Sequence, residues 1–582
     1  MWPSRAARLE FSPAQGKLCN DGVPDYCVEK RDKPDPKAGK MTKSKTAVLI
    51  AFLFAILAAM GGASVLKVGL YIGKHEGDTL HLMQIVFRMA DGQIPHLDFM
   101  TPIGALAFWP IAMLVKSGLG IGMAVIWSQV IAALIFLPML VWVARSRLSP
   151  WLGALFGLFV MVLLLALVHG EAQRSVSISM HYNRLAWAAA FVAIVTALIP
   201  PANNLGRARA GIDGIIIGLM VCVMVMIKMT YFVSFAVPIV VALLMTGQGR
   251  AVLYAVLTGV VVVGTITVFA GFEYWIAYAQ DLLEVAVSEV RSAPGEPLSA
   301  VMGAPAYLGG SMAAMVGVIF LRQAQVATGG LVLLLLIPGF FYVTYQNFGN
   351  DPQWLLLLAI LLLALREQAA DVVNGWGWNL RDGLVLVAAV ALALTAPSFF
   401  NLAYSPYRHV NIDVTGYVPI LPRGDVHTDL QSLDLRVNRV DARIALDGNV
   451  AGLPAYPDRD EPPVFKGETL PICSVELGLP MVMDAMVRDL EGAGLAQGKS
   501  LFAADVFSSH WLFGALEPMD QGAPWYYGGL PGIEDADYLL VPLCPVVQEV
   551  QRQILETIEE RGDAISVTEI RRTELYILYQ LG

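Results

Sequence analysis

The stretch HEGDTLHLMQIVFRMADGQIPHLDFMTP, residues 75–102, follows the first long apolar run of the chain and guides the interpretation of the rest. Its polar residues recur at steps of three or four, so on a helix they form one stripe: Asp78, His81, Gln84, Arg88 and Asp91. Apolar residues fill the positions between them, and Gly92 marks the end of the pattern. The pattern predicts an amphipathic helix on a membrane surface, with the polar stripe facing water or a cavity.

Asp78 at the start of this helix has two interpretations. An acid at the boundary of a bilayer is a candidate functional residue, because burying a charge there is costly. Asp is also a favoured residue at the N-cap of a helix. Both roles are open for Asp78, and capping does not exclude catalysis.

The composition identifies the class of protein. Of the 582 residues, 56% are hydrophobic and only 15% are charged, whereas soluble globular domains carry about a quarter charged residues. Repeated apolar runs of about 20 residues predict an α-helical polytopic membrane protein. The net charge of −9, without a basic patch interleaved with aromatic residues, predicts no nucleic-acid partner.

About eleven membrane spans are expected in the first 400 residues. They are predicted at 46–73, 121–144, 150–168, 185–201, 211–229, 231–247, 251–271, 305–321, 329–345, 353–366 and 383–400. The apolar run 103–115 is short and follows Pro102, which favours a re-entrant or interfacial helix over a span.

Charge in the short loops predicts the orientation in a cytoplasmic (inner) membrane. If 103–115 does not span, the arginine-rich loops fall on the same side as the lysine-rich N-terminus, and such loops are cytoplasmic. The segments 74–120, 169–184, 272–304 and 346–352 are then outer connections. The sequence therefore predicts a disordered cytoplasmic tail (1–45), a transmembrane region (46–400) with a large outer loop (74–120), and a soluble domain on the periplasmic or extracellular side (401–582), here called the outer domain.

The outer domain is expected to have an α/β fold. Buried strands are predicted at 500–506 and 536–541, a helix at 546–560, and two late strands at 565–570 and 574–579. Cys473 and Cys544 both lie in this domain, where an oxidising exterior permits a disulfide. The sequence is equally compatible with a disulfide between them and with two unpaired buried thiols.

Polar residues that could bind a substrate gather at the outer ends of the spans. They are His81, Arg88, Asp98, Glu171, Arg174, His181, Arg184, Lys228, Asn347 and Asp351. The acids could remove a proton, and the cations could hold a phosphate. Lys228 lies at the end of a long apolar run, where a charge requires a partner or an anionic ligand.

Several of these residues also have a structural interpretation. Arg174 and Arg184 could be interfacial anchors whose charged ends reach water. Lys228 could pair with an acid on a neighbouring helix, and His181 could be a hydrogen-bonded structural residue. What favours a functional site is that these residues converge on one side of the membrane.

Other chemistries lack their sequence motifs. The chain has no Walker phosphate loop, no dinucleotide fingerprint, no HExxH and no nucleophile elbow. These absences argue against ATP-driven transport, redox chemistry and metalloproteolysis. No group of residues forms a clear metal site.

The order of elements around Asp78 resembles a known family. An inside N-terminus and a first span are followed by Gly77-Asp78, an amphipathic helix that ends in ADGQIPHLDF (90–99), and a helix after Pro102. This arrangement resembles the integral-membrane glycosyltransferases of the GT-C fold, especially the protein-mannosyltransferase and aminoarabinose-transferase-like branch. The resemblance covers about 46–400 and is strongest over 70–110. The branch often has an Asp-Glu pair in this loop, where this chain has Glu76-Gly77-Asp78-Thr79.

The resemblance implies a function and roles for residues. Such enzymes transfer a sugar from a polyprenyl-phosphate carrier in the membrane to an envelope glycan, lipid or protein acceptor outside it. Asp78 would be the catalytic base, with Glu76 as the second catalytic candidate. Lys228 and Arg184 would stabilise the leaving lipid phosphate, with Arg174 or His181 as further helpers. Members of the family differ in their use of a divalent cation, so cofactor use stays open.

A competing interpretation is a lipid-linked-sugar flippase or a secondary transporter without catalytic activity. The large outer domain argues against it, as do polar residues at the outer boundary, because transport sites usually lie near the middle of the membrane. A polymer ligase with a similar outer cavity is a third alternative, within the enzyme class.

Overall fold

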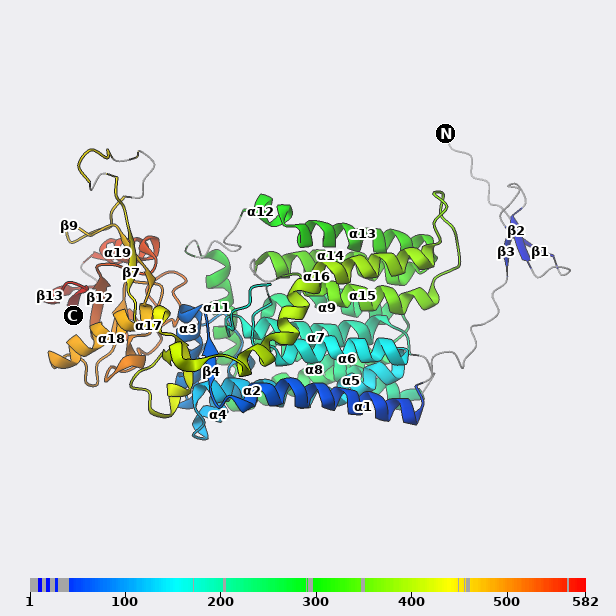
Figure 1. Cartoon of the computed structure of the whole chain (residues 1–582), viewed down its shortest axis with the longest axis horizontal. Coiled ribbons are helices and arrows are strands. Elements are labelled where there is room, and N and C mark those ends of the chain that lie inside the picture. The colour runs from blue at the N-terminus through cyan, green and yellow to red at the C-terminus, as the bar shows by residue number, and fades with distance from the viewer. Residues whose placement is uncertain are drawn as a thin grey trace.

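The computed structural model describes most of the chain after residue 40 and short parts of the N-terminal tail. The described residues are 9–12, 17–20, 27–29, 41–170, 172–201, 206–288, 290, 297–346, 351–447, 450–454, 456, 461–562 and 565–582. A bundle of long helices carries the strand-containing outer domain at one end, and the start of α1 lies at the other end (Figure 1).

Every predicted span coincides with a helical segment in the described residues. These segments are α1–α2 (Lys43–Ile56, the π-helical turn Leu57–Gly61, and Gly62–Leu66), α5 (Ile121–Arg147), α6 (Pro150–Leu165), α7 (His181–Leu198), α8 (Gly206–Ile227), α9 (Met229–Met245), α10 (Gly249–Ala270), α13 (Pro305–Gln323), α14 (Ala327–Gln346), α15 (Trp354–Leu365) and α16 (Leu380–Val410). Seven of them are long and apolar enough to cross a membrane. The chain is a polytopic α-helical membrane protein.

A buried charge cluster joins two helices at the end of the bundle far from the outer domain. Arg147, at the end of α5, places its Nη2 2.6 Å from Asp213 Oδ2 on α8. Arg209 Nε lies 3.7 Å from the same carboxylate oxygen. Arg209 Nη2 also donates to the carbonyl of Ser146 on α5 at 3.0 Å, so both arginines hold α5 against α8. They lie where the sequence predicted cytoplasmic charge.

The helix predicted from the polar stripe is α3 (Glu76–Ala90), and the stripe is not open to water along its length. Gln84 Nε2 donates to Ser509 Oγ at 2.7 Å and to the carbonyl of Pro524 at 3.0 Å. Arg88 Nη2 donates to the carbonyl of Met519 at 3.0 Å. The prediction that the stripe faces water or a cavity is therefore wrong at Gln84 and Arg88, which residues of the outer domain cover, whereas Asp78 borders a cavity and Asp91 is exposed.

The segment after Pro102 does not span the bundle. A 3-10 turn (Ala105–Ala107) leads into α4 (Trp109–Lys116), which packs against α3 at the end that carries the outer domain (Figure 1). Gly104 lies against the end of α8, where an added Cβ would come 2.2 Å from the carbonyl oxygen of Met226. Only glycine permits this approach, which brings the loop beside Lys228.

The outer domain has the predicted α/β character. Its main sheet has the order β11 (Leu501–Ala503), β12 (Tyr538–Pro542), β14 (Tyr576–Leu581) and β13 (Val567–Arg572), with only the first pair parallel. Helices α18 (Leu479–Gly492) and α19 (Gln548–Glu560) accompany it. All four predicted strands and the predicted helix are confirmed. The last span, α16, runs ten residues past its predicted end at 400, so the domain begins after Val410.

Smaller elements complete the described residues. They are β4 (Leu70–Ile72), α11 (Glu273–Val287), α12 (Leu298–Gly303), β5 (Tyr417–Pro419), β6 (Leu430–Leu433), α17 (Asp434–Val437), β7 (Asp441–Ile444), β8 (Val464–Phe465), β9 (Glu468–Thr469), β10 (Cys473–Leu477), and 3-10 turns at Arg366–Gln368, Val414–Gly416, Asp425–Asp429, His510–Phe513 and Ile533–Asp535. Strand β6 pairs in parallel with β4 of the membrane region. The outer domain is therefore joined to the bundle by a shared sheet as well as by the chain.

Cys473 and Cys544 form a disulfide, with their Cα atoms 4.8 Å apart. The bond joins the start of β10 to the residues that follow β12. Of the two alternatives left open by the sequence, the structure has the bridge.

Three short strands lie in the N-terminal tail. β1 (Leu9–Ser12), β2 (Lys17–Asn20) and β3 (Cys27–Glu29) form an antiparallel sheet. The rest of 1–40 lies outside the described residues, so disorder of the tail stays a prediction.

The sidedness of the bundle can be tested by labelling. In a variant without Cys19, Cys27 and Cys222, a cysteine at the exposed position Glu534 should react with an impermeant thiol reagent in cells with a permeable outer membrane. A cysteine in the 202–210 loop should react only after lysis, because that loop belongs to the predicted cytoplasmic face. Labelling of the loop but not of position 534 in intact cells would reverse the predicted orientation.

Candidate active site

A small cavity lies where α3 and α7 begin. Its lining residues are Asp78, His81, Leu82, Phe108, Ile178, Met180, His181 and Tyr182. The open volume is about 20 Å³, which is little more than a water molecule needs. Three predicted site residues, Asp78, His81 and His181, thus come together from two helices 100 residues apart in the chain.

Asp78 is not the cap of α3. The N-cap is His75, whose side chain makes no capping hydrogen bond, and the helix begins at Glu76. Asp78 is therefore the third helical residue, where the helix dipole favours a carboxylate. Its Oδ2 accepts a hydrogen bond from Ser179 Oγ at 2.5 Å. This contact fixes one oxygen of a half-buried carboxylate that borders the cavity.

Both helices of the cavity begin after a strained residue. His75 (φ 65°) and Met180 (φ 48°) are the N-caps of α3 and α7, and both adopt the left-handed conformation without being glycine. Such strain costs of order 1 kcal/mol or more and gathers at functional sites. Here it sets the direction in which the first turns of α3 and α7 present Asp78 and His181.

The histidines around Asp78 are held in place. His75 Nδ1 lies 2.9 Å from Ser177 Oγ, and burial is the largest cause that lowers the pKa of His75. His181 Nε2 lies 3.2 Å from the carbonyl oxygen of Ala107. The ring of His81 packs edge-to-face on Trp525 with centroids 5.4 Å apart. Burial therefore favours the neutral form of the His75 ring.

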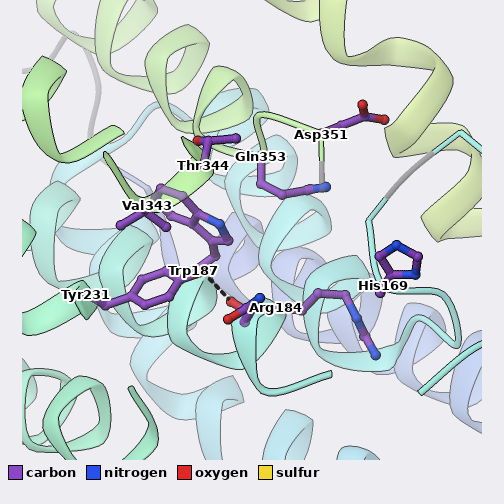
Figure 2. Close-up of a pocket in the computed structure, with 9 residues that line it drawn as sticks. His169, Arg184, Trp187, Tyr231, Val343, Thr344, Asp351 and Gln353 are labelled. Carbon is purple, nitrogen blue, oxygen red and sulfur yellow. Dashed lines mark hydrogen bonds between the residues drawn. The ribbon is translucent and has the colours of Figure 1, made fainter. Parts of the chain in front are cut away.

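A second cavity lies on the other side of the start of α7 and is shown in Figure 2. It is lined by His169, Asn183, Arg184, Trp187, Tyr231, Val343, Thr344, Asp351 and Gln353. Its open volume is about 10 Å³, enough for roughly one water. Small-molecule sites usually measure about 300 Å³ or more, so substrate binding at either cavity requires side chains to move.

Arg184 is the most deeply buried cation of this second cavity, with 2% of its surface exposed. Nη1 donates to the carbonyl oxygen of Leu163 at 2.9 Å. Within the described residues, Nε and Nη2 have no hydrogen-bond partner. Figure 2 shows the Asp351 carboxylate pointing away from the guanidinium group. Two buried donors next to a cavity are suited to an anionic ligand, and the interfacial-anchor interpretation of Arg184 does not fit its burial.

Lys228 lies between the two cavities. It is the N-cap of α9, at the break between α8 and α9, with an extended backbone (φ −156°). Its Nζ donates to Asn183 Oδ1 at 3.2 Å and lies 5.6 Å from the centre of the Tyr182 ring. Asn183 lines the second cavity and Tyr182 lines the first. Lys228 and Arg184 therefore place two positive charges around the first turn of α7.

Asp351 is half-buried at the rim of the second cavity. Its backbone N–H donates to the carbonyl of Gly170 at 2.8 Å, which joins two outer connections. Burial raises the pKa of its carboxyl group.

Four predicted site residues lie elsewhere in the structure. Arg88 is buried between Phe99 and Trp511, and burial lowers its pKa to about 10.

Asp98 Oδ2 accepts from the backbone N–H of Ile94 at 2.6 Å and so closes a turn. Arg174 is exposed, and its backbone carbonyl accepts a hydrogen bond from Arg408 Nη1 at 2.6 Å. Glu76 pairs with Arg436 of the outer domain, with Oε1 2.6 Å from Nε.

Glu171 and Asn347 lie outside the described residues, so their predicted roles stay predictions. In the part of the chain that the structure describes, no group of three or more histidine, cysteine, aspartate or glutamate residues could hold a metal ion.

Of the residues that line or support the two cavities, Ser179 and Trp187 had no signal in the sequence. Ser179 holds Asp78, and Tyr182 and Asn183 contact Lys228. Trp187 and Tyr231 close the second cavity, where Tyr231 OH donates to the backbone carbonyl of Asn183 at 3.2 Å. Tyr182, Asn183 and Tyr231 had a signal in the sequence, because they belong to the polar runs His181-Tyr182-Asn183-Arg184 and Lys228-Met229-Thr230-Tyr231 at the ends of spans.

Comparisons with known proteins give one structural match. No family model matches the chain, and no curated protein matches it. The crystal structure of ArnT from Cupriavidus metallidurans in the apo state matches with 11% identity and a TM-score of 0.38, over 92% of this chain and 98% of that chain.

Proposed function

We propose that this protein is a membrane glycosyltransferase that moves a sugar from a polyprenyl-phosphate carrier to an acceptor on the outer face of the cytoplasmic membrane. The observation that supports this most directly is the pairing of two kinds of group around the start of α7. A fixed carboxylate, Asp78, borders one cavity. Two cations lie nearby: Arg184 lines the other cavity, and Lys228 lies between the two cavities.

The reaction requires both kinds of group. The acceptor hydroxyl loses its proton to the Asp78 carboxylate while its oxygen forms a bond to the anomeric carbon of the sugar. The bond between that carbon and the phosphate oxygen breaks, and its electron pair stays on the departing lipid phosphate. Arg184 and Lys228 stabilise this negative charge, and a buried cation does so more strongly than an exposed one.

Transfer and transport can be separated by following the sugar. Membranes of a deletion strain should accumulate a lipid-linked sugar and carry an underglycosylated envelope component. Purified protein added to those membranes should release free polyprenyl phosphate and attach the sugar covalently to the component. Movement of the intact lipid-linked sugar across vesicles, without release of polyprenyl phosphate, would show a flippase and contradict the proposal.

Lys228→Met should weaken binding of polyprenyl phosphate by about tenfold to a hundredfold, because a hydrogen bond to a charged group contributes about 1.5–3 kcal/mol. Folding should be affected less, since methionine is close to lysine in length and keeps the apolar packing of its stem while the contacts of Nζ to Asn183 and to the Tyr182 ring are lost. Binding is measured by titrating the purified variant with polyprenyl phosphate. Lys116→Met, at the exposed end of α4, is the matched control. Parental affinity in Lys228→Met would make Lys228 a structural residue.

A further inference from the structure

One short segment of the outer domain contacts the membrane region in three places. This segment, residues 429–436, is called the clasp here. The carboxylate of Asp429 accepts hydrogen bonds from the backbone N–H groups of Gly122 (3.0 Å) and Met123 (2.8 Å) at the start of α5. The next residues form β6, which pairs with β4. The clasp thus holds the strand that leads directly into the loop before α3.

The third contact is to the first residue of α3. Glu76 Oε1 accepts from Ser432 Oγ at 2.8 Å and from Arg436 Nε at 2.6 Å. The Glu76 side chain is only 8% exposed. A buried carboxylate is stable only with a partner charge and satisfied hydrogen bonds, and both of its partners belong to the clasp.

The outer domain also touches the next residue of this turn. A Cβ at Gly77 would lie 2.6 Å from the ring of Phe507, so the helix packs directly against that ring. Phe507 packs edge-to-face on Trp525 (4.8 Å), which in turn packs on His81 (5.4 Å). The first turn of α3 is therefore fixed by an ion pair at Glu76 and by aromatic packing at Gly77.

We infer that Arg436 is a positioning residue of the transfer reaction: through Glu76 it fixes the first turn of α3 and hence the direction of the Asp78 carboxylate. The inference rests on the proposed role of Asp78 as the base. A general base has to lie within about 3 Å of the proton that it removes, and misplacement by about 1 Å can cost about a hundredfold in rate. Glu76 was a catalytic candidate in the sequence. On this inference its role is instead to bind the outer domain and so fix the turn of α3 that carries Asp78.

The test uses three variants of the full-length protein. Arg436→Met removes the charge at similar length, Arg436→Lys restores a cation, and Arg439→Met is the control, because Arg439 is 61% exposed and pairs with Asp441. Turnover and KM are measured with the lipid-linked sugar extracted from the deletion strain, and binding is measured with polyprenyl phosphate alone. Arg436→Met should lower kcat by about ten- to a hundredfold with donor binding little changed. Arg436→Lys should recover most of kcat, and Arg439→Met should match the parent.

Two outcomes would overturn the inference. One is parental kcat in Arg436→Met. The other is a loss of kcat that matches the fraction of unfolded protein in a thermal melt and that lysine does not rescue. Asp78→Asn separates this inference from the proposed function. If Asp78→Asn keeps its turnover, the assignment of the base is wrong; if it loses turnover while Arg436→Met does not, only the role of Arg436 is wrong.

Discussion

Asp78→Asn should transfer sugar at about a hundredth to a ten-thousandth of the parental rate, which is the usual cost of losing a positioned general base. The amide keeps the size of the side chain and can still accept the hydrogen bond from Ser179 Oγ. It cannot take up the proton of the acceptor hydroxyl. Insertion, thermal stability and binding of polyprenyl phosphate should therefore stay close to those of the parent, while kcat falls.

Asp91→Asn is the matched control for this experiment. Asp91 is the exposed residue that ends α3, far from the cavity along the same polar stripe. It should behave like the parent. Turnover close to parental in Asp78→Asn would limit Asp78 to a structural role and direct the search for the base to Glu171 and Asp351.

Arg184→Met should weaken binding of polyprenyl phosphate by about tenfold to more than a hundredfold, the range expected for charge-assisted hydrogen bonds. The same change should leave the melting temperature of the ligand-free protein unchanged or raise it. In the described residues the guanidinium is buried with only Leu163 as a hydrogen-bond partner, and an incompletely paired buried charge is costly. A gain in stability with a loss of binding is typical of a residue that serves a ligand.

The opposite pattern would assign Arg184 to the structure. If Arg184→Met melts several degrees lower and binds polyprenyl phosphate as the parent does, its bond to Leu163 holds α6 against α7 and the anion site lies elsewhere. Arg174→Met is the control, since Arg174 is exposed in the loop before α7. It should change neither property.

The membrane spans could be predicted from the sequence because each depends on a local property, an apolar run of sufficient length. The two late strands were predicted at 565–570 and 574–579, two residues before their observed positions, since their β-type patterns are carried by consecutive residues. The end of α16 was misplaced because its last turns are polar although still helical, from Asn401 to Val410.

The surroundings of the site could not be predicted, because they depend on contacts between distant segments. The stripe pattern of α3 is the same whether water or protein covers it. The hydrogen bonds of Gln84 to Ser509 and of Arg88 to Met519 could therefore not be predicted. Ser179 and Ser432 are ordinary serines in the sequence and acquire roles only through their distance to Asp78 and Glu76. Asp78, His81 and His181 could be predicted to meet because all three lie next to a span on the same predicted side.

On the proposed mechanism, the clasp also determines when the protein can become active during its synthesis. Ser432 and Arg436 lie 356 and 360 residues after Glu76, and chains are made and begin to fold from the N-terminus. The bundle can therefore insert in the membrane while α3 still lacks the partners of its first turn. The donor site around Arg184 and Lys228 would then form before the protein can transfer sugar. The first turn of α3, which carries Asp78, would be fixed only when the outer domain has crossed the membrane and folded.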